Sequence, residues 1–373
     1  MRYQRVIMTM IFSILAMVIL AMGCINPAKI YVDQGEKFYI EWQWGDAITA
    51  YNKAKELDGG RYEKMIEGRL TTCYEYRARD YLKNGDVFKA LEDYNKLIEM
   101  EPQNAARYFK RGTVYSGVSL YDLAISDFNK VIELTNSPTA YCKRGHTYKD
   151  KGDNDKAIAD CTKAIELDPR LAEAYETRGS AYFFKQDYDT AIADCTKAIE
   201  INSELTEAYE TRGAAYSVKL DYDKAISDAT KAIEIDPEPG TGYLIRGSAY
   251  LGKRDIDKAI ADFTKAIEID PRYAEYYTTR GVAYLVKQDY DKAISDTTKA
   301  IEIEPGDAGG YLVRGTAYFF KQEYNKVISD ATNAIEIKPK CAECYKIRSA
   351  AYAKIGNNGK AVDDLNKATE LEK

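Results

Sequence analysis

The residues best suited to chemistry in this chain are its seven cysteines and its single histidine. Cys341 and Cys344 form a C-x-x-C pair, a spacing that permits a disulfide in an exported protein. A zinc site would need a second pair of ligands, and the sequence shows none. Cys341 and Cys344 are therefore candidates for a disulfide, and we expect no metal or other cofactor.

The histidine, His146, is not part of any recognisable catalytic motif. The sequence contains no Ser–His–Asp set, no glycine-rich phosphate loop and no H-E-x-x-H motif. Its 59 Asp and Glu residues recur periodically, as on solvated helix faces, and they outnumber the 53 Lys and Arg residues. The resulting net charge of −6 argues against a nucleic-acid partner. We expect a protein that is not an enzyme and does not bind nucleic acid.

Residues 1–26 differ from the rest of the chain. Two arginines lie within the first five residues, an almost wholly apolar run spans 6–22, and Gly23-Cys24 follows. This order is typical of a secretory signal. The run Ala21-Met22-Gly23-Cys24 resembles the lipobox of bacterial lipoproteins, which implies that Cys24 is lipidated and becomes the N-terminus. An uncleaved membrane anchor and a simple cleaved signal are the alternatives. All three predict export, and the favoured one predicts a membrane-anchored protein of the cell envelope or periplasm.

The elements that position these residues follow from a repeat of 34 residues. An Arg-Gly pair recurs with this spacing at Arg144, Arg178, Arg212, Arg246, Arg280 and Arg314. Within one copy, Tyr175, Gly179 and Tyr182 share a helical face, and Gly179 leaves room for a second helix to approach. A polar turn and a second helical pattern follow, and proline closes most copies. A helix–turn–helix unit with a fixed period predicts a solenoid, which offers a long binding surface.

The unit resembles the tetratricopeptide repeat, whose pattern is W-x2-L-G-x2-Y, then A-x3-F, then P. Here Tyr replaces the Trp and Arg replaces the Leu, while the Gly, the second Tyr and the Ala match. In this frame, repeats 2–10 cover 71–373, with starts at 71, 105, 138, 172, 206, 240, 274, 308 and 342. A divergent repeat 1 covers 28–61, and 62–70 are an insertion. The resemblance implies an all-α, right-handed superhelical solenoid of about ten repeats.

Two charged positions recur together within the repeat. Arg stands at the seventh position and Asp at the twenty-third position of repeats 2–10, whereas repeat 1 has Gln34 and Ala50 there. A planar guanidinium can bind a carboxylate through two hydrogen bonds, so we expect a ladder of Arg–Asp pairs between facing helices. An inherited pattern without contact is the alternative. A partly exposed pair would contribute about 0–1 kcal/mol, which makes the ladder structural.

The resemblance also implies where a partner would bind. In this family the first helix of each repeat lines a concave groove, and positions 2, 5, 9, 12 and 13 usually meet the ligand. Positions of this kind are polar in repeat 4, at Lys143 (one position off the pattern), His146 and Lys149. They are apolar in the later repeats, at Phe183, Phe184, Leu244, Leu251, Leu285, Val286, Leu312, Phe319 and Phe320. Such a stripe can seat an amphipathic helix or an extended apolar segment, although packing on the adjoining repeat is the simpler explanation for any one residue.

The function that follows is a non-enzymatic, membrane-tethered scaffold that binds a protein or peptide partner in its groove. A glycan-binding or carbohydrate-processing protein is the alternative, because Glu173, Glu176, Glu207 and Glu210 lie near Phe183 in the same frame. Self-association is a third possibility, because the last repeat ends without a further polar capping helix.

Overall fold

The computed structural model describes residues 26–372. The apolar run, the candidate signal and Cys24 lie outside the described residues. Within 26–372 the chain is entirely helical, with twenty helices in consecutive pairs and no strand. This confirms the all-α class and the helix–turn–helix unit.

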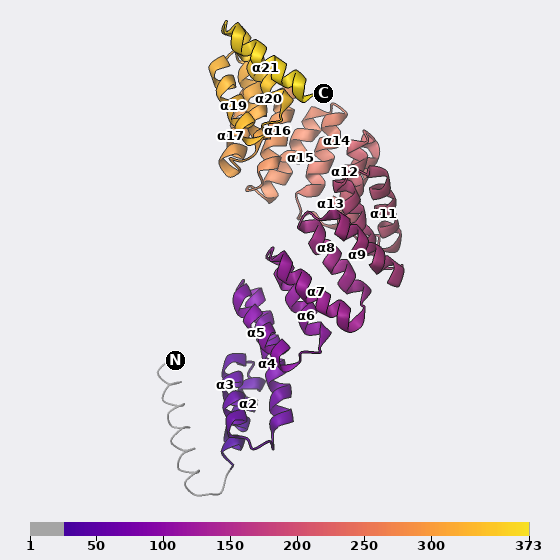
Figure 1. Cartoon of the computed structure of the whole chain (residues 1–373), viewed down its shortest axis with the longest axis vertical. Helices are drawn as coiled ribbons and strands as arrows, with labels where there is room; N and C mark the ends of the chain where they lie inside the picture. The colour runs from indigo at the N-terminus through magenta and orange to yellow at the C-terminus, as the bar shows by residue number, and fades with distance from the viewer. Residues whose placement is uncertain (1–25, 373) are drawn as a thin grey trace. The chain divides into compact units, whose positions relative to one another are not determined.

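The described chain divides into two compact parts at Pro169. The N-terminal part holds four helix pairs, shown in indigo to magenta in Figure 1: α2 (Pro27–Ile40) with α3 (Trp44–Leu57), α4 (Glu63–Lys83) with α5 (Val87–Met100), α6 (Ala105–Gly117) with α7 (Tyr121–Thr135), and α8 (Pro138–Asp150) with α9 (Asn154–Leu167).

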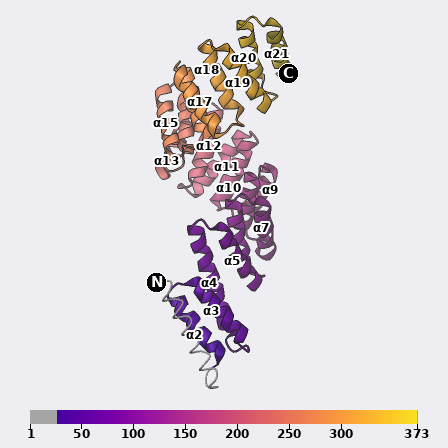
Figure 2. The ribbon, with the colours of Figure 1, turned by 90° about the vertical axis from the view of Figure 1, so that its left-hand side faces the viewer.

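The C-terminal part begins at Arg170 and holds six pairs, which Figure 2 shows from a second side. They are α10 (Ala172–Phe184) with α11 (Tyr188–Ile201), α12 (Thr206–Val218) with α13 (Tyr222–Ile235), α14 (Thr241–Gly252) with α15 (Ile256–Ile269), α16 (Ala274–Val286) with α17 (Tyr290–Ile303), α18 (Ala308–Phe320) with α19 (Tyr324–Ile337), and α20 (Ala342–Lys354) with α21 (Asn358–Leu371).

Most pairs close around a glycine at the eighth position of the repeat, although repeat 2 has Ala78 and repeat 10 has Ser349 there. A Cβ atom added to Gly179 would lie 2.8 Å from Sγ of Cys195 and 3.2 Å from the carbonyl oxygen of Ala191. At Gly281 the added atom would lie 2.7 Å from Cγ2 of Thr297. The expectation that glycine permits close approach of the second helix is confirmed at these positions.

The turn inside each pair has a left-handed residue at the fifteenth position of the repeat. Three repeats place glycine there, at Gly85, Gly152 and Gly356, with φ between 79° and 88°. Other repeats place a residue with a side chain in the same conformation, such as Leu220 with φ 64°. Glycine adopts this conformation without steric cost, whereas a residue with a Cβ atom is strained. The second helix then begins, often capped by an aspartate such as Asp187, whose side chain accepts from the Thr190 N–H.

The nine residues that the repeat frame leaves over, 62–70, largely belong to a helix. They lengthen α4 to 21 residues, and they bring Arg69 to α2. Arg69 donates two hydrogen bonds to Glu36, at 2.7 and 2.9 Å, and Tyr51 donates a third at 2.9 Å. Repeat 1 lacks the recurrent Arg and Asp, and this bidentate pair links it to α4 instead.

The first helices of neighbouring repeats contact one another. In the C-terminal part α10 contacts α12, α12 contacts α14, α16 contacts α18 and α18 contacts α20. Among the described residues, second helices of neighbouring repeats show no comparable contact. Within this part the stack is therefore tighter on the side of the first helices. None of the described helices has the length and apolar character needed to span a bilayer.

Candidate partner-binding face

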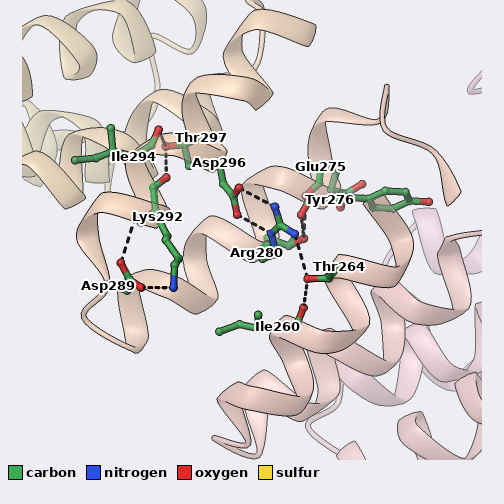
Figure 3. A network of polar contacts seen from close by, with 12 residues as sticks. Ile260, Thr264, Glu275, Tyr276, Arg280, Asp289, Lys292, Ile294, Asp296 and Thr297 are labelled. Atoms are coloured by element: carbon green, nitrogen blue, oxygen red, sulfur yellow. Dashed lines mark hydrogen bonds and ion pairs between the residues drawn. The ribbon is translucent and has the colours of Figure 1, made fainter. Parts of the chain in front are cut away.

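The recurrent arginines and aspartates form nine bidentate ion pairs, as the sequence predicts. In each pair Nε and one terminal nitrogen of the guanidinium donate to the two carboxylate oxygens, at 2.6–2.9 Å. Figure 3 shows the pair of Arg280 on α16 and Asp296 on α17. The hydrogen bond with Asp296 raises the pKa of Arg280, because it favours the charged guanidinium.

The same arginines also link neighbouring repeats. The second terminal nitrogen of Arg280 donates to the hydroxyl of Thr264, on the second helix of the preceding repeat, at 3.1 Å. Thr264 in turn donates to the carbonyl oxygen of Ile260 at 2.7 Å (Figure 3). Equivalent bonds join Arg111 to Asn95, Arg144 to Asn129, Arg212 to Thr196, Arg246 to Thr230, Arg314 to Thr298 and Arg348 to Thr332. One guanidinium thus joins three helices.

Burial shows that breaking these pairs costs more than the sequence led us to expect. The nine aspartates are only 2–8% exposed, and their arginine side chains are 16–26% exposed. Removing one partner of a buried pair leaves an uncompensated charge, which costs about 3–5 kcal/mol. The ladder therefore holds the repeats together, and its groups are engaged with one another rather than available to a ligand.

Exposed apolar side chains recur at the thirteenth position of the repeat, at the end of the first helix. In the C-terminal part four such residues form what we call the apolar row: Phe184 (61% exposed), Val218 (49%), Val286 (54%) and Phe320 (56%). Phe320 stacks on Tyr290 of the preceding repeat, with ring centroids 5.2 Å apart, and still keeps more than half of its surface exposed. Sequence reasoning missed Val218, although the repeat frame assigns it to the same position.

The other apolar candidates are only partly exposed because they pack within the solenoid. Phe183 and Phe319 each contact the tyrosine that opens their own second helix, Tyr188 and Tyr324, with centroids 5.6 Å apart. Leu244 and Leu251 pack on the core cluster around Phe263, Leu312 packs on the cluster around Ala334, and Leu285 is half-buried. Of these six candidates, Phe183 and Phe319 also contact Phe184 and Phe320 of the apolar row, and all six offer a partner less surface than the row does.

The polar candidates lie on α8, in the N-terminal part. His146 meets Asp150 with Nδ1 3.1 Å from a carboxylate oxygen, and Lys149 lies 3.5 Å from the other oxygen. Burial opposes the charge of Asp150, but hydrogen bonds from His146 and Lys149 and their charges hold its pKa below the usual value. Lys143 is exposed on the same helix. Two of the three candidate side chains thus already contact a carboxylate.

Carboxylates gather between α10, α12 and the loop before α14. Glu210 is half-buried, and its pKa rises to about 7, first through burial and then through Glu207, Asp236 and Glu176. A hydrogen bond from the Gly242 N–H, at the start of α14, opposes this rise. Asp236 and Gly242 join the site through the tertiary structure, so the sequence pattern did not indicate them.

Cys341 and Cys344 lie at the start of α20. Their sulfur atoms are 2.09 Å apart, in the arrangement of a disulfide. Both residues pack with Ala308 and Ala334 in the core between α18, α19 and α20. Among the described residues, no group of three or more His, Cys, Asp or Glu side chains is placed to hold a metal ion.

Family models match the repeats directly. Models described as "Tetratricopeptide repeat" match 138–171, 172–205, 206–239 and 274–307, and a model described as "TPR repeat" matches 247–288. The matched boundaries at 138, 172, 206 and 274 coincide with repeat starts derived from the sequence.

Curated relatives share short stretches of this pattern. Mouse peptidyl-prolyl cis-trans isomerase FKBP4 is 27% identical over 31% of this chain and 27% of its own length. Rat mitochondrial import receptor subunit TOM34 is 26% identical over 28% of this chain and 33% of its own length. Rat serine/threonine-protein phosphatase 5 is 36% identical over 20% of this chain and 15% of its own length. The alignments span a third or less of each of these relatives.

Solved structures show the same fold. A tetratricopeptide repeat protein from Parabacteroides merdae covers 66% of this chain with 98% of its own, at a TM-score of 0.54 and 21% identity. The APC/C hetero-tetramer Cut9-Hcn1 covers 95% of both chains, at a TM-score of 0.51 and 14% identity. The family models therefore identify tetratricopeptide repeats within 138–307, and the described helix pairs share the fold of these solved structures.

Proposed function

We propose that this chain is a non-enzymatic scaffold for protein–protein interaction, tethered to a membrane by its N-terminal segment. Its C-terminal part binds a protein or peptide segment in a concave groove formed by the first helices. The observation that carries this proposal is the apolar row, which exposes Phe184, Val218, Val286 and Phe320 at the same place in four repeats. Exposed apolar side chains that gather on one face of a protein support an interaction site there.

The arrangement of the helices supports a concave face on this side. First helices of neighbouring repeats contact one another, which brings their exposed side chains closer together than those of the second helices. Extended or helical peptides bind such faces through side chains spaced to meet successive repeats. The relatives that share this repeat include a mitochondrial import receptor subunit, which is consistent with a role in recognising other proteins.

The chemistry of the face favours an apolar segment that carries basic residues. The apolar row would take apolar side chains, and the exposed carboxylate of Glu207 would attract Lys or Arg. The chain's net charge of −6 adds to this preference at long range. The same charge disfavours nucleic acid as a partner.

A crosslinking pull-down from membranes tests the binding face. We expect the wild type to retain a protein partner that the double variant Phe184→Glu/Phe320→Glu loses. The matched control is Ile269→Glu/Ile337→Glu, which changes two residues that are each 39% exposed at the ends of second helices. Equal retention of the partner by all three proteins would contradict binding at the apolar row.

The membrane tether is tested separately. If Cys24 is lipidated, metabolic labelling with a fatty acid marks the wild type and fails to mark Cys24→Ser. If the wild type takes up no fatty acid label but stays in the membrane fraction, the result favours an uncleaved anchor over lipidation. An unlabelled wild type in the soluble fraction contradicts the tether.

A further inference from the structure

The edge formed by the turns inside each pair changes character along the chain. In later repeats a lysine at the fourteenth position binds an aspartate at the eighteenth position of the preceding repeat. These exposed pairs are Lys151 with Asp122, Lys219 with Asp189, Lys253 with Asp223, Lys287 with Asp257 and Lys321 with Asp291. The last four form a charged row along this edge of the C-terminal part.

The junctions between repeats 1 and 2 and between repeats 2 and 3 lack this pair. Where repeats 2 and 3 meet, the two positions hold Phe88 and Val118, so both charged residues are replaced by apolar ones. Phe88 is 78% exposed, although the corresponding Asp122 one repeat later binds Lys151. The substitution removes charge from the turn edge at the end of the solenoid that follows the N-terminal segment.

Other apolar side chains at the same turns extend this surface. We define the turn-edge patch as six residues from the turns of repeats 1–3 and the helix ends beside them: Ile40, Trp42, Phe88, Val118, Leu120 and Leu123. All are exposed, and the first three show more than 70% of their surface. Trp42 occupies the left-handed position of its turn, with φ 59°, a backbone conformation that favours glycine over a large aromatic residue. These six side chains are therefore not needed to fill the core.

We infer that the turn-edge patch rests on the lipid bilayer and orients the solenoid on the membrane. This inference rests on the proposed membrane tether. Tryptophan is enriched where protein meets the bilayer interface, because its ring is apolar and its N–H is polar. Exposed Ile, Leu and Phe side chains next to it supply the buried apolar area that holds a surface to lipid.

The position of the tether makes contact with lipid geometrically feasible. Pro27 is the third residue after Cys24, so α2 would begin within about 10 Å of a lipidated cysteine. Since α2 has 14 residues and is about 21 Å long, a tilt of about 30° toward the membrane lowers its far end by about 10 Å and brings Trp42 to the bilayer. The patch and the tether then hold the first repeat at two points.

The charges around the patch predict that insertion of its apolar side chains, and not attraction to anionic lipid, holds the patch to the bilayer. Lys83 and Lys89 lie near Phe88, but Lys89 binds Asp86, and Glu41 is exposed beside Trp42. The two signs balance locally, so anionic lipid gains little from this surface. We expect the contact to form on zwitterionic vesicles and to persist in high salt.

The chain contains only two tryptophans, which makes the test specific. Trp44 is the internal comparison, because it stacks on Tyr76 with centroids 5.0 Å apart and donates to Asp80 at 2.9 Å. Full-length protein is reconstituted in phosphatidylcholine vesicles with and without bromine-labelled acyl chains. In Trp44→Phe, which keeps Trp42, we expect strong quenching by bromine; in Trp42→Phe we expect much less.

Further variants in the Trp44→Phe background identify the surface. Phe88→Glu/Leu123→Glu should abolish the quenching of Trp42 while the protein still floats with the vesicles and keeps its helical circular dichroism. Leu220→Glu is the matched control, since Leu220 is 69% exposed at the same turn position in the C-terminal part, and it should leave the quenching unchanged. If the protein floats with the vesicles but Trp42 is not quenched, the lipid contact of the patch is wrong and the tether stands. If the protein does not float, both the tether and the lipid contact are wrong.

Discussion

Replacing Asp296 with alanine removes one half of an Arg–Asp pair in the middle of the C-terminal part. Arg280 would keep only its bond to Thr264, and its side chain is 16% exposed. Loss of a fully buried partner costs about 3–5 kcal/mol, and limited access to water lowers this to about 2–3 kcal/mol here. Because repeats interact with their nearest neighbours, the loss should appear as local opening of α15–α18.

Hydrogen exchange read by mass spectrometry measures this opening in the full-length chain. Asp296→Ala should lower protection in α16 and α17 by about 30- to 140-fold, and it should leave α2–α5 unchanged. The control is Glu302→Ala, which removes the exposed pair of Lys299 and Glu302 on the same helix and should cost less than about 0.5 kcal/mol. Arg280→Met/Asp296→Leu should cost less than Asp296→Ala, because no buried charge remains unpaired. Equal effects of Asp296→Ala and Glu302→Ala would refute the reasoning.

Three further predictions concern the repeat turn, the helix contact and the carboxylate cluster. Leu220→Gly should raise the melting temperature through a gain of about 0.5–1 kcal/mol, because Leu220 has φ 64° and is 69% exposed; a lower melting temperature would contradict the strain. Gly281→Ala should cost about 1–3 kcal/mol in denaturant unfolding, because its Cβ would lie 2.7 Å from Cγ2 of Thr297. Adding Thr297→Ala should recover part of that loss, and a failure to do so would place the clash elsewhere. Burial raises the pKa of Glu210 to about 7, so its ionisation costs stability as pH rises from about 4.5 through 7. The amides of α12 should therefore exchange more slowly in Glu210→Gln than in the wild type at pH 8, and at the same rate in both at pH 4.5. A difference in exchange rate that is the same at both pH values would exclude titration of Glu210 as the cause.

The repeat fold and its ladder could be predicted from the sequence because they recur. Nine copies of Arg and Asp in a fixed register predict one contact many times, and all nine pairs form. The cost of breaking these pairs could not be predicted, because it depends on how far the packing of neighbouring helices buries a residue such as Asp296. The bond from Arg280 to Thr264 joins different repeats, and pairing within one repeat gave no reason to expect it.

The candidate face was predicted less completely. The family positions indicated both Phe residues at the C-terminal end of α10 and both at that of α18. The structure shows that Phe183 and Phe319 contact the tyrosines of their own repeats, whereas Phe184 and Phe320 stay exposed. A repeat frame assigns a residue to a helix face, but the neighbouring side chain decides how much of it remains exposed. Glu36 and Arg69 show the same limit, because a bond between a divergent repeat and an insertion has no recurrent pattern.

Site-specific photocrosslinking in intact membranes tests the central claim, that the first helices of the C-terminal part bind a protein partner. A photoreactive amino acid is placed at Phe184 or Phe320 in the apolar row, and at Glu200 or Glu302 on the exposed side of the second helices. We predict that the first two positions crosslink the same partner protein and that the other two do not. Crosslinks of equal yield from all four positions, or from the second helices alone, would contradict the claim.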